Sequence, residues 1–111
     1  IGEALSLAKN AGLDLRKVLE VAAVADFKTP IYAGVGAGVI KGDYEVNFPL
    51  KLMLKDSRLI QAFAKRFNSP VTIASTTEEL AKEGVDSGLG ELNASAIVKV
   101  ISKRAGVDLV E

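Results

Sequence analysis

Apolar residues recur every three or four positions along most of this chain, a spacing that favours helices over strands. The first such stripe ends at Gly12, a residue type that commonly follows the last turn of a helix. Its members are Ile1, Ala4, Leu5, Ala8 and Ala11. Asp14 then stands where a second helix would begin, because its side chain can accept hydrogen bonds from unpaired backbone N–H groups. We therefore expect two short helices in the first 25 residues.

A third helix is expected from Thr29-Pro30 to about Lys41-Gly42, with glycines at positions 34, 36 and 38 inside it. These glycines raise the possibility of a phosphate-binding loop, and Asp56 lies 20 residues beyond Gly36. The dinucleotide pattern G-x-G-x-x-G would need glycine where Val39 stands, and no strand is expected before the run. We therefore interpret the glycines as small residues for close helix packing.

The longest helix is expected to open at Asn47 before Phe48-Pro49 and to run to about Phe67, where Asn68 and Ser69-Pro70 end it. Residues 71–82 contain β-branched residues that suit a strand, but no second segment resembles its strand partner, so we predict a helix. A glycine-rich loop is expected over residues 85–90 and a last helix over about residues 92–104. The predicted fold is all-α, a bundle of about six helices that forms a single domain over residues 1–111.

Composition excludes several kinds of chemistry. The chain has 111 residues, with 14 Lys and Arg against 14 Asp and Glu, and it contains no Cys and no His. A disulfide, a thiolate nucleophile, a Ser-His-Asp triad and a His or Cys metal site are therefore excluded, and we expect no metal. A net charge of zero gives no electrostatic reason to expect nucleic acid or a membrane surface as a partner. The longest uncharged stretch, Thr29 to Ile40, is shorter than the ~20 residues that cross a bilayer, so we expect a cytoplasmic protein.

Charged residues of the longest helix are the candidates for a site. Asp56 has only apolar residues three and four positions away, so it must be paired, protonated or placed at a cleft. Four cations form one stripe on this helix, and no acid of the helix is expected beside them: Lys51, Lys55, Arg58 and Lys65. Two interpretations remain open at this point. Lys55 and Asp56 pair with charges on neighbouring helices and the stripe is a solvated face, or the helix presents cations to a phosphate or carboxylate.

The stretch Phe48-Pro49-Leu50-Lys51-Leu52-Met53-Leu54-Lys55-Asp56, with Leu59 beyond it, resembles the F-x-x-x-L-M-x-K-D-x-x-L-A signature of the 3-hydroxyisobutyrate dehydrogenase family. The opening Glu3 to Asp14 is similar to the family segment E-A-L-x-L-A-x-x-A-G-L-D, and Gly42-Asp43-Tyr44 is similar to G-D-F. These motifs occur in the family's order and spacing. The sequence departs from the pattern at Ile60, where the family has Ala, and at Asn93, where it has Asp in G-x-x-D-(F/Y/A)-S-A.

The resemblance implies a C-terminal helical domain of an NAD(P)-dependent enzyme, with a fold like the corresponding domain of 6-phosphogluconate dehydrogenase. An N-terminal Rossmann domain and a helix with the catalytic Lys are expected before Ile1, so no catalytic residue is expected in this chain. Lys55 resembles the family Lys that contacts NAD or NADP from the second domain. Phe48 and Asp56 resemble the aromatic and the acid that shape the substrate side of the cleft. The implied activity is hydride transfer to or from a small 3-hydroxyacid or semialdehyde.

The resemblance also implies a homo-oligomer, because family members form dimers or tetramers through this domain. Separation from a Rossmann domain is expected to expose apolar area near Ile1, Leu5 and Met53, which would favour association. The alternative to an enzyme is a non-catalytic helical module of the same fold that serves in dimerisation or another protein interaction. The substrate, the preference between NAD and NADP and the oligomer size do not follow from the sequence.

Overall fold

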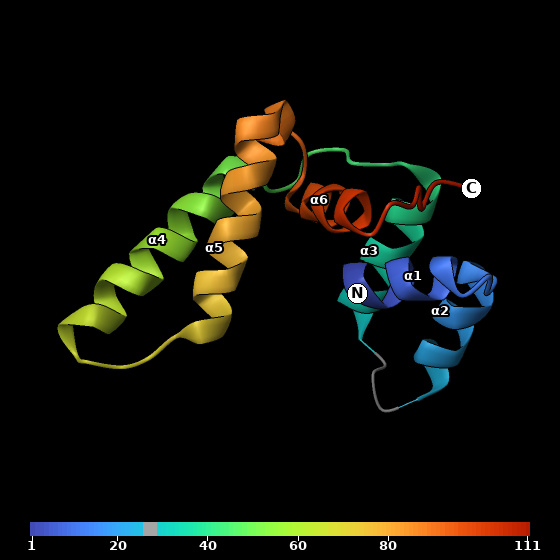
Figure 1. Ribbon diagram of the computed structural model, residues 1–111, viewed down its shortest axis with the longest axis horizontal. Helices are drawn as coiled ribbons and strands as arrows, with labels where there is room; N and C mark the ends of the chain where they lie inside the picture. The colour runs from blue at the N-terminus through green and yellow to red at the C-terminus, as the bar shows by residue number, and fades with distance from the viewer. Residues whose placement is uncertain (26–28) are drawn as a thin grey trace. The chain divides into compact units, whose positions relative to one another are not determined.

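A computed structural model describes residues 1–25 and 29–111, and these residues contain six α-helices and no β-strand (Figure 1). The predicted all-α fold with about six helices is confirmed. Contacts divide the chain into two compact units, one formed by residues 1–44 and 98–111 and the other by residues 45–97. Each unit is described by itself. The prediction of one domain over residues 1–111 stays a prediction.

The first unit is built from α1 (Gly2–Asn10), α2 (Leu15–Val24), α3 (Pro30–Lys41) and most of α6 (Ile97–Arg104). The predicted caps are present, because Asp14 accepts from the backbone N–H groups of Arg16 and Lys17 and Thr29 accepts from that of Tyr32. Glycine at position 42 ends α3 with φ of 70°, a conformation that costs other residues energy. Side chains from all four helices and the C-terminal tail are buried: Leu5, Ala8, Leu15, Val39, Ile40, Val98, Val100 and Leu109.

Close packing against other side chains explains one of the three glycines of α3, and a Cβ on Gly38 would lie 3.2 Å from the backbone oxygen of Asp43. A Cβ on Gly36 would lie 2.6 Å from a methyl carbon of Leu19 and 2.9 Å from one of Ile1, whereas a Cβ on Gly34 would meet nothing within 4 Å. The glycines lie inside a helix and follow no strand, so they do not form a phosphate loop. The predicted packing role is therefore confirmed for Gly36 and not for Gly34.

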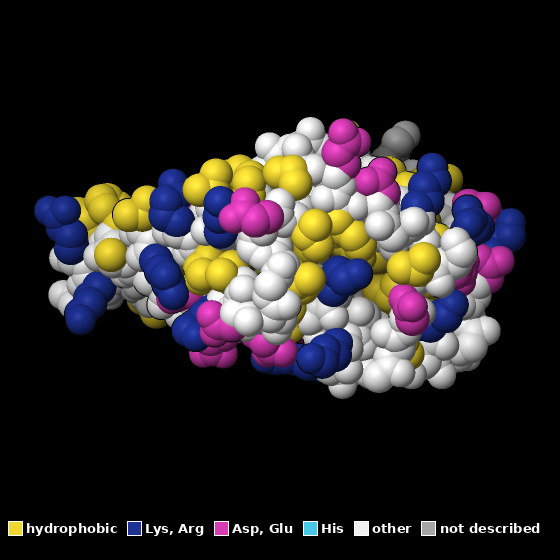
Figure 2. Space-filling view, turned by 90° about the horizontal axis from the view of Figure 1, so that it is seen from above, with side chains coloured by type: hydrophobic (Ala, Val, Ile, Leu, Met, Phe, Trp, Pro, Cys, Tyr) yellow, Lys and Arg dark blue, Asp and Glu magenta, His cyan; other side chains and the backbone are white. Residues whose placement is uncertain are grey.

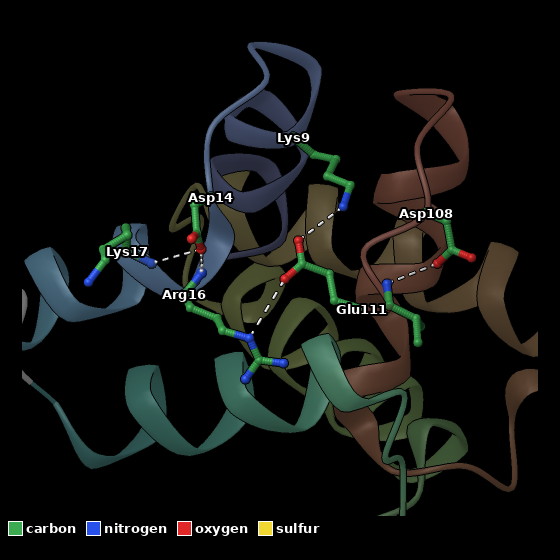
Figure 3. Close-up of polar contacts among 7 residues, drawn as sticks. Lys9, Asp14, Arg16, Lys17, Asp108 and Glu111 are labelled. Carbon is green, nitrogen blue, oxygen red and sulfur yellow. Dashed lines mark hydrogen bonds and ion pairs between the residues drawn. The ribbon is translucent and has the colours of Figure 1, made fainter.

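The C-terminal tail contacts three helices of the first unit through Glu111. The backbone N–H of Glu111 donates to the carbonyl of Ile40 at 2.9 Å. Its carboxylate pairs with Lys9 of α1 at 3.0 Å and lies 3.9 Å from Nε of Arg16 in α2, as Figure 3 shows. This end of the chain thus connects three helices of the unit.

The second unit is a pair of helices, α4 (Leu50–Arg66) and α5 (Thr72–Gly84), which lie side by side in Figure 1. Leu50, Leu54 and Ala81 form its buried core, against which Met53, Val85, Leu89 and Ile97 pack. Asn68 has a positive φ of 51° just beyond α4, which agrees with the predicted stop. The helix predicted over residues 71–82 is confirmed.

Two expectations for the later part of the chain are wrong. Residues 85–90 are not a loop, because helical turns continue through Val85–Leu89 (η1) until Gly88 leaves the helical conformation with φ of 84°. The last helix does not begin near Leu92. A 3-10 turn, Ala94–Ala96 (η2), comes before α6, because residues 90–94 bond to the start of α4 instead.

Candidate functional site

The start of α4 is held by the segment of residues 90–92, which lies about 40 residues later in the chain. Leu50 N–H donates to the carbonyl of Leu92 at 2.9 Å, and Lys51 N–H donates to that of Gly90 at 3.0 Å. No described side chain caps this helix, so these two carbonyls satisfy donors that an N-terminal turn otherwise leaves unpaired. Lys51 Nζ also contacts both carboxylate oxygens of Glu91, at 2.6 and 2.8 Å.

Phe48 lies at a bend of the backbone just before the helix. A residue before proline is restricted to extended conformations, and Pro49 pairs with Asn93 in an isolated antiparallel bridge. The carbonyl of Phe48 accepts from Ala94 N–H at 2.7 Å, and the backbone N–H of Phe48 donates to Oδ1 of Asn93 at 3.1 Å. The backbone of Phe48 is thus fixed on both sides while its side chain stays 41% exposed.

Helix α4 carries apolar side chains on two faces, and only one of them is covered by the described residues. The covered face contributes Leu50, Leu54 and Ala64 to the interior of the unit. The other face, which we name the open face of α4, consists of exposed Leu52, Leu59, Ile60, Phe63 and Phe67. In Figure 2, apolar side chains alternate with Lys and Arg on the surface of α4 and α5. An apolar hollow of about 550 Å³ lies at the C-terminal end of this face, beside Phe63 and Val71.

Lys55 and Asp56 lie among these apolar residues and pair with each other. The distance from Nζ of Lys55 to Oδ1 of Asp56 is 2.8 Å, with the side chains 58% and 47% exposed. We expected no acid of this helix beside the basic stripe. This expectation is wrong, because Asp56 pairs with Lys55. Three of the four cations are paired, Lys51 with Glu91, Lys55 with Asp56 and Arg58 with Glu78. Long flexible side chains reach partners that helical spacing alone does not place beside them.

A polar network fixes α4 against α5 next to this pair. Arg58 Nε donates to Glu78 at 3.3 Å, and the amide of Gln61 donates to the other oxygen of the same carboxylate. Ser75 Oγ donates to the amide oxygen of Gln61 at 2.9 Å. This network lies on the side of α4 that faces α5, and Lys55 and Asp56 take no part in it.

Of the three predicted site residues, Phe48 lies just before α4, and Lys55 and Asp56 lie in its first two turns. At ~1.5 Å per residue, Asp56 lies about 9 Å along the axis from Leu50. In the sequence Asn93 is only a departure from a motif, and its contact with Phe48 was not predicted. No local signal indicates this contact, because the two residues lie 45 positions apart.

Tyr44 lies outside this stretch, in the first unit. Burial raises the pKa of its hydroxyl above the usual value, and the nearby carboxylate of Asp108 raises it further. Lys99 Nζ lies 4.8 Å from the centre of the ring, a distance suited to a cation–π contact. Among residues 1–25 and 29–111, no three acidic side chains are grouped as a metal site, and no helix is long and apolar enough to cross a membrane.

A family model described as the NAD-binding domain of NADP-dependent 3-hydroxyisobutyrate dehydrogenase matches residues 1–101. The chain belongs to the 3-hydroxyisobutyrate dehydrogenase family. The family description names NAD and NADP, so the predicted nicotinamide cofactor and the predicted class of enzyme family are confirmed.

Relatives and a solved structure agree with this family. Glyoxylate/succinic semialdehyde reductase 2 of Arabidopsis thaliana, a chloroplastic protein, is 31% identical over 99 residues, which are 89% of this chain and 28% of the relative. Cytokine-like nuclear factor N-PAC of Anopheles gambiae is 31% identical over 97 residues, or 87% of this chain and 17% of that protein. The crystal structure of 3-hydroxyisobutyrate dehydrogenase from Salmonella typhimurium matches with a TM-score of 0.82 and 27% identity, over 89% of this chain and 35% of that one. The chain thus spans about a third or less of the length of these proteins.

Proposed function

We propose that this chain is the C-terminal helical domain of an NAD(P)-dependent oxidoreductase that acts on a small 3-hydroxyacid or semialdehyde. In this proposal the domain covers the cofactor, which an upstream Rossmann domain holds, and contributes an oligomer interface. The observation that carries the proposal is the open face of α4, an uncovered apolar surface with the Lys55–Asp56 pair within it. Large exposed apolar surfaces rimmed by polar groups are typical of interaction sites.

Lys55 has the properties required of a cofactor contact made from a second domain. Its ammonium is exposed, its side chain is long, and among the described residues it pairs with the neighbouring Asp56. An exposed ion pair contributes about 0–1 kcal/mol, so an anionic cofactor can draw the ammonium away at little cost. The residues present therefore fit NAD or NADP, and Lys55 would hold it.

Phe48 and Asp56 would form the substrate side of the same stretch. Hydrogen bonds hold the backbone of Phe48 on both sides and so fix the point from which its side chain extends. A side chain held in this way suits an apolar wall beside a small substrate. The carboxylate of Asp56 accepts hydrogen bonds, so it suits the hydroxyl of a hydroxyacid better than the carboxylate. A bound nicotinamide supplies the hydride acceptor or donor. We place the proton-transferring Lys upstream of Ile1 and no catalytic residue in this chain.

A cytoplasmic location and a dimer or tetramer belong to the same proposal. Two of the residues expected at an exposed apolar surface do not lie on one. Leu5 is 1% exposed, and Met53 packs against the core of its unit. These two side chains are therefore not themselves exposed, although Leu7 and Leu52 near them in the sequence are. A group of exposed apolar side chains also lies on the open face of α4, where Phe63 is 62% exposed.

Titration of NADPH into the isolated chain tests the division of roles. The proposal expects the full-length protein to bind NADPH tightly and the isolated chain not to. The described residues of the isolated chain contain no phosphate-binding loop, and the chain contributes only Lys55 to the cofactor in this proposal. Tight binding by the isolated chain would contradict the assignment of the cofactor to an upstream domain.

A second candidate, a non-catalytic interaction module of the same fold, is favoured by one observation. The relative from Anopheles gambiae is named a nuclear factor and not a dehydrogenase, although it matches 87% of this chain. This candidate expects the full-length protein to show no NADPH-dependent reduction of glyoxylate or succinic semialdehyde, whereas the enzyme proposal expects reduction of at least one small acid or semialdehyde.

A further inference from the structure

The strongest unassigned feature of the second unit is the side chain of Asn93. Its Oδ1 accepts from two consecutive backbone N–H groups, those of Asn47 at 3.2 Å and Phe48 at 3.1 Å. Both partners are donors, so the atom that they contact must be the oxygen of the amide. Its Nδ2 then donates to Ser95 Oγ at 2.9 Å, and all parts of the amide have partners.

The surrounding backbone does not replace this contact. Pro49 has no N–H, and the antiparallel hydrogen bonds to residues 90–92 begin only at Leu50 and Lys51. On the other side of the proline, one backbone bond, from Ala94 N–H to the carbonyl of Phe48, joins the two segments. Asn93 therefore supplies the one acceptor for the N–H groups of Asn47 and Phe48, the two residues that lead into α4.

We propose that Asn93 is a positioning residue that acts on the substrate through Phe48. By holding two adjacent N–H groups at one oxygen, it fixes the direction in which Phe48 leaves the backbone and the point at which α4 begins. This inference rests on the proposed function, in which Phe48 faces the substrate. Asn93 does not contact the cofactor in this proposal. Its loss is therefore expected to change the KM of the substrate and to leave the KM of the cofactor nearly unchanged.

The choice of variants follows from the chemistry of the amide. Asn93→Ala removes this acceptor, whereas Asn93→Asp keeps a carboxylate oxygen for the same two N–H groups and is expected to restore function. Ser95→Ala is the matched control, because it removes the partner of Nδ2 and leaves both contacts to residues 47 and 48 in place. Phe48→Ala tests the proposed function separately.

The experiment measures two quantities in the full-length protein. Residue-level hydrogen exchange reports whether the amides of Asn47 and Phe48 are held, and steady-state kinetics with glyoxylate and NADPH reports the KM of each. In Asn93→Ala we expect about tenfold faster exchange at these two amides and about a tenfold higher KM for glyoxylate. Exchange at Leu50 and Lys51 and the KM for NADPH should change little, and Asn93→Asp should recover both quantities.

Three results would overturn the inference. Unchanged exchange at Asn47 and Phe48 would show that the contact does not hold them. Faster exchange with an unchanged KM for glyoxylate would show that Asn93 has a structural role alone, and so would equal effects of Asn93→Ala and Ser95→Ala. If Phe48→Ala raises that KM in any of these cases, the proposed function stands and only the role of Asn93 fails. If Phe48→Ala also leaves it unchanged, the substrate role proposed for Phe48 fails as well.

Discussion

Replacement of Gly36 by Ala tests whether the glycines of α3 serve close packing, and Gly34→Ala is its matched control. Both positions are in the same helix, and neither has a positive φ, so both substitutions gain the same intrinsic helix preference of about 1 kcal/mol. A Cβ at position 34 meets nothing within 4 Å, so this gain should appear undiminished as a higher free energy of unfolding.

At position 36 the new methyl group would lie 2.6 Å from Leu19 and 2.9 Å from Ile1, closer than carbon atoms approach without movement. Forcing an extra methyl group into a packed interior costs about 1–3 kcal/mol. The leucine methyl can shift, which places the cost nearer the lower end. We expect Gly36→Ala to be less stable than Gly34→Ala by about 1–3 kcal/mol, and no more stable than the original chain.

Urea unfolding followed by far-ultraviolet circular dichroism measures this difference, and it suits a mostly helical chain without Trp. The comparison uses the difference between the two variants, so it does not depend on the absolute stability. Equal unfolding free energies for Gly34→Ala and Gly36→Ala would refute the packing argument.

Two further predictions concern titration and association. The absorbance titration of tyrosinate, taken as the difference between the original chain and Tyr44→Phe, should show Tyr44 ionising above the usual pKa of about 10, because burial disfavours the phenolate. Because folding raises the pKa of Tyr44, the contribution of this residue to the free energy of unfolding is complete below about pH 10 and is lost as the pH rises through the pKa of the folded state. A difference in stability between the two proteins that does not change with pH over this range would argue against the raised pKa. In sedimentation, the isolated chain should be at least a dimer and Phe63→Ser should weaken association, whereas Val24→Ser, which alters an exposed residue of the first unit, should not. A monomeric original chain would contradict the proposed interface.

The elements that the sequence predicted well depend on neighbours within a few positions. Asp14 caps α2 because the donors that it bonds lie two and three residues away, and Gly42 ends α3 through its own φ. The helix over residues 72–84 was predictable because no second strand exists elsewhere in the sequence to pair with it.

The errors arise where a distant segment decides the local structure. Leu92 and Asn93 have a helical pattern around them, but their polar groups bond to residues 47–50, which no local rule indicates. The sequence also could not predict that the open face of α4 is exposed. Apolar residues lie on both faces of this helix, and only contacts in the structure show which face is covered.

The helix that carries Lys55 and Asp56 was predictable, and its pairing was not. That Phe48, Lys55 and Asp56 form a site stays a prediction. From the sequence it was open whether Lys55 and Asp56 pair with neighbouring helices. They pair with each other, because a side chain as long as that of Lys can turn back to an adjacent carboxylate.

The central claim is that this domain contributes Lys55 to a nicotinamide cofactor held mainly by another domain. The most direct test is the KM for NADPH in the full-length protein, measured with glyoxylate for Lys55→Ala and for Lys82→Ala. Lys82 is a matched control, because it is 57% exposed and pairs with Asp86 of its own segment, as Lys55 pairs with Asp56.

A hydrogen bond to a charged group contributes about 1.5–3 kcal/mol, so we predict that Lys55→Ala raises the KM for NADPH at least about tenfold. Lys82→Ala should leave this KM unchanged. If the two variants have the same KM as the original protein, Lys55 does not contact the cofactor and the account of this domain is wrong.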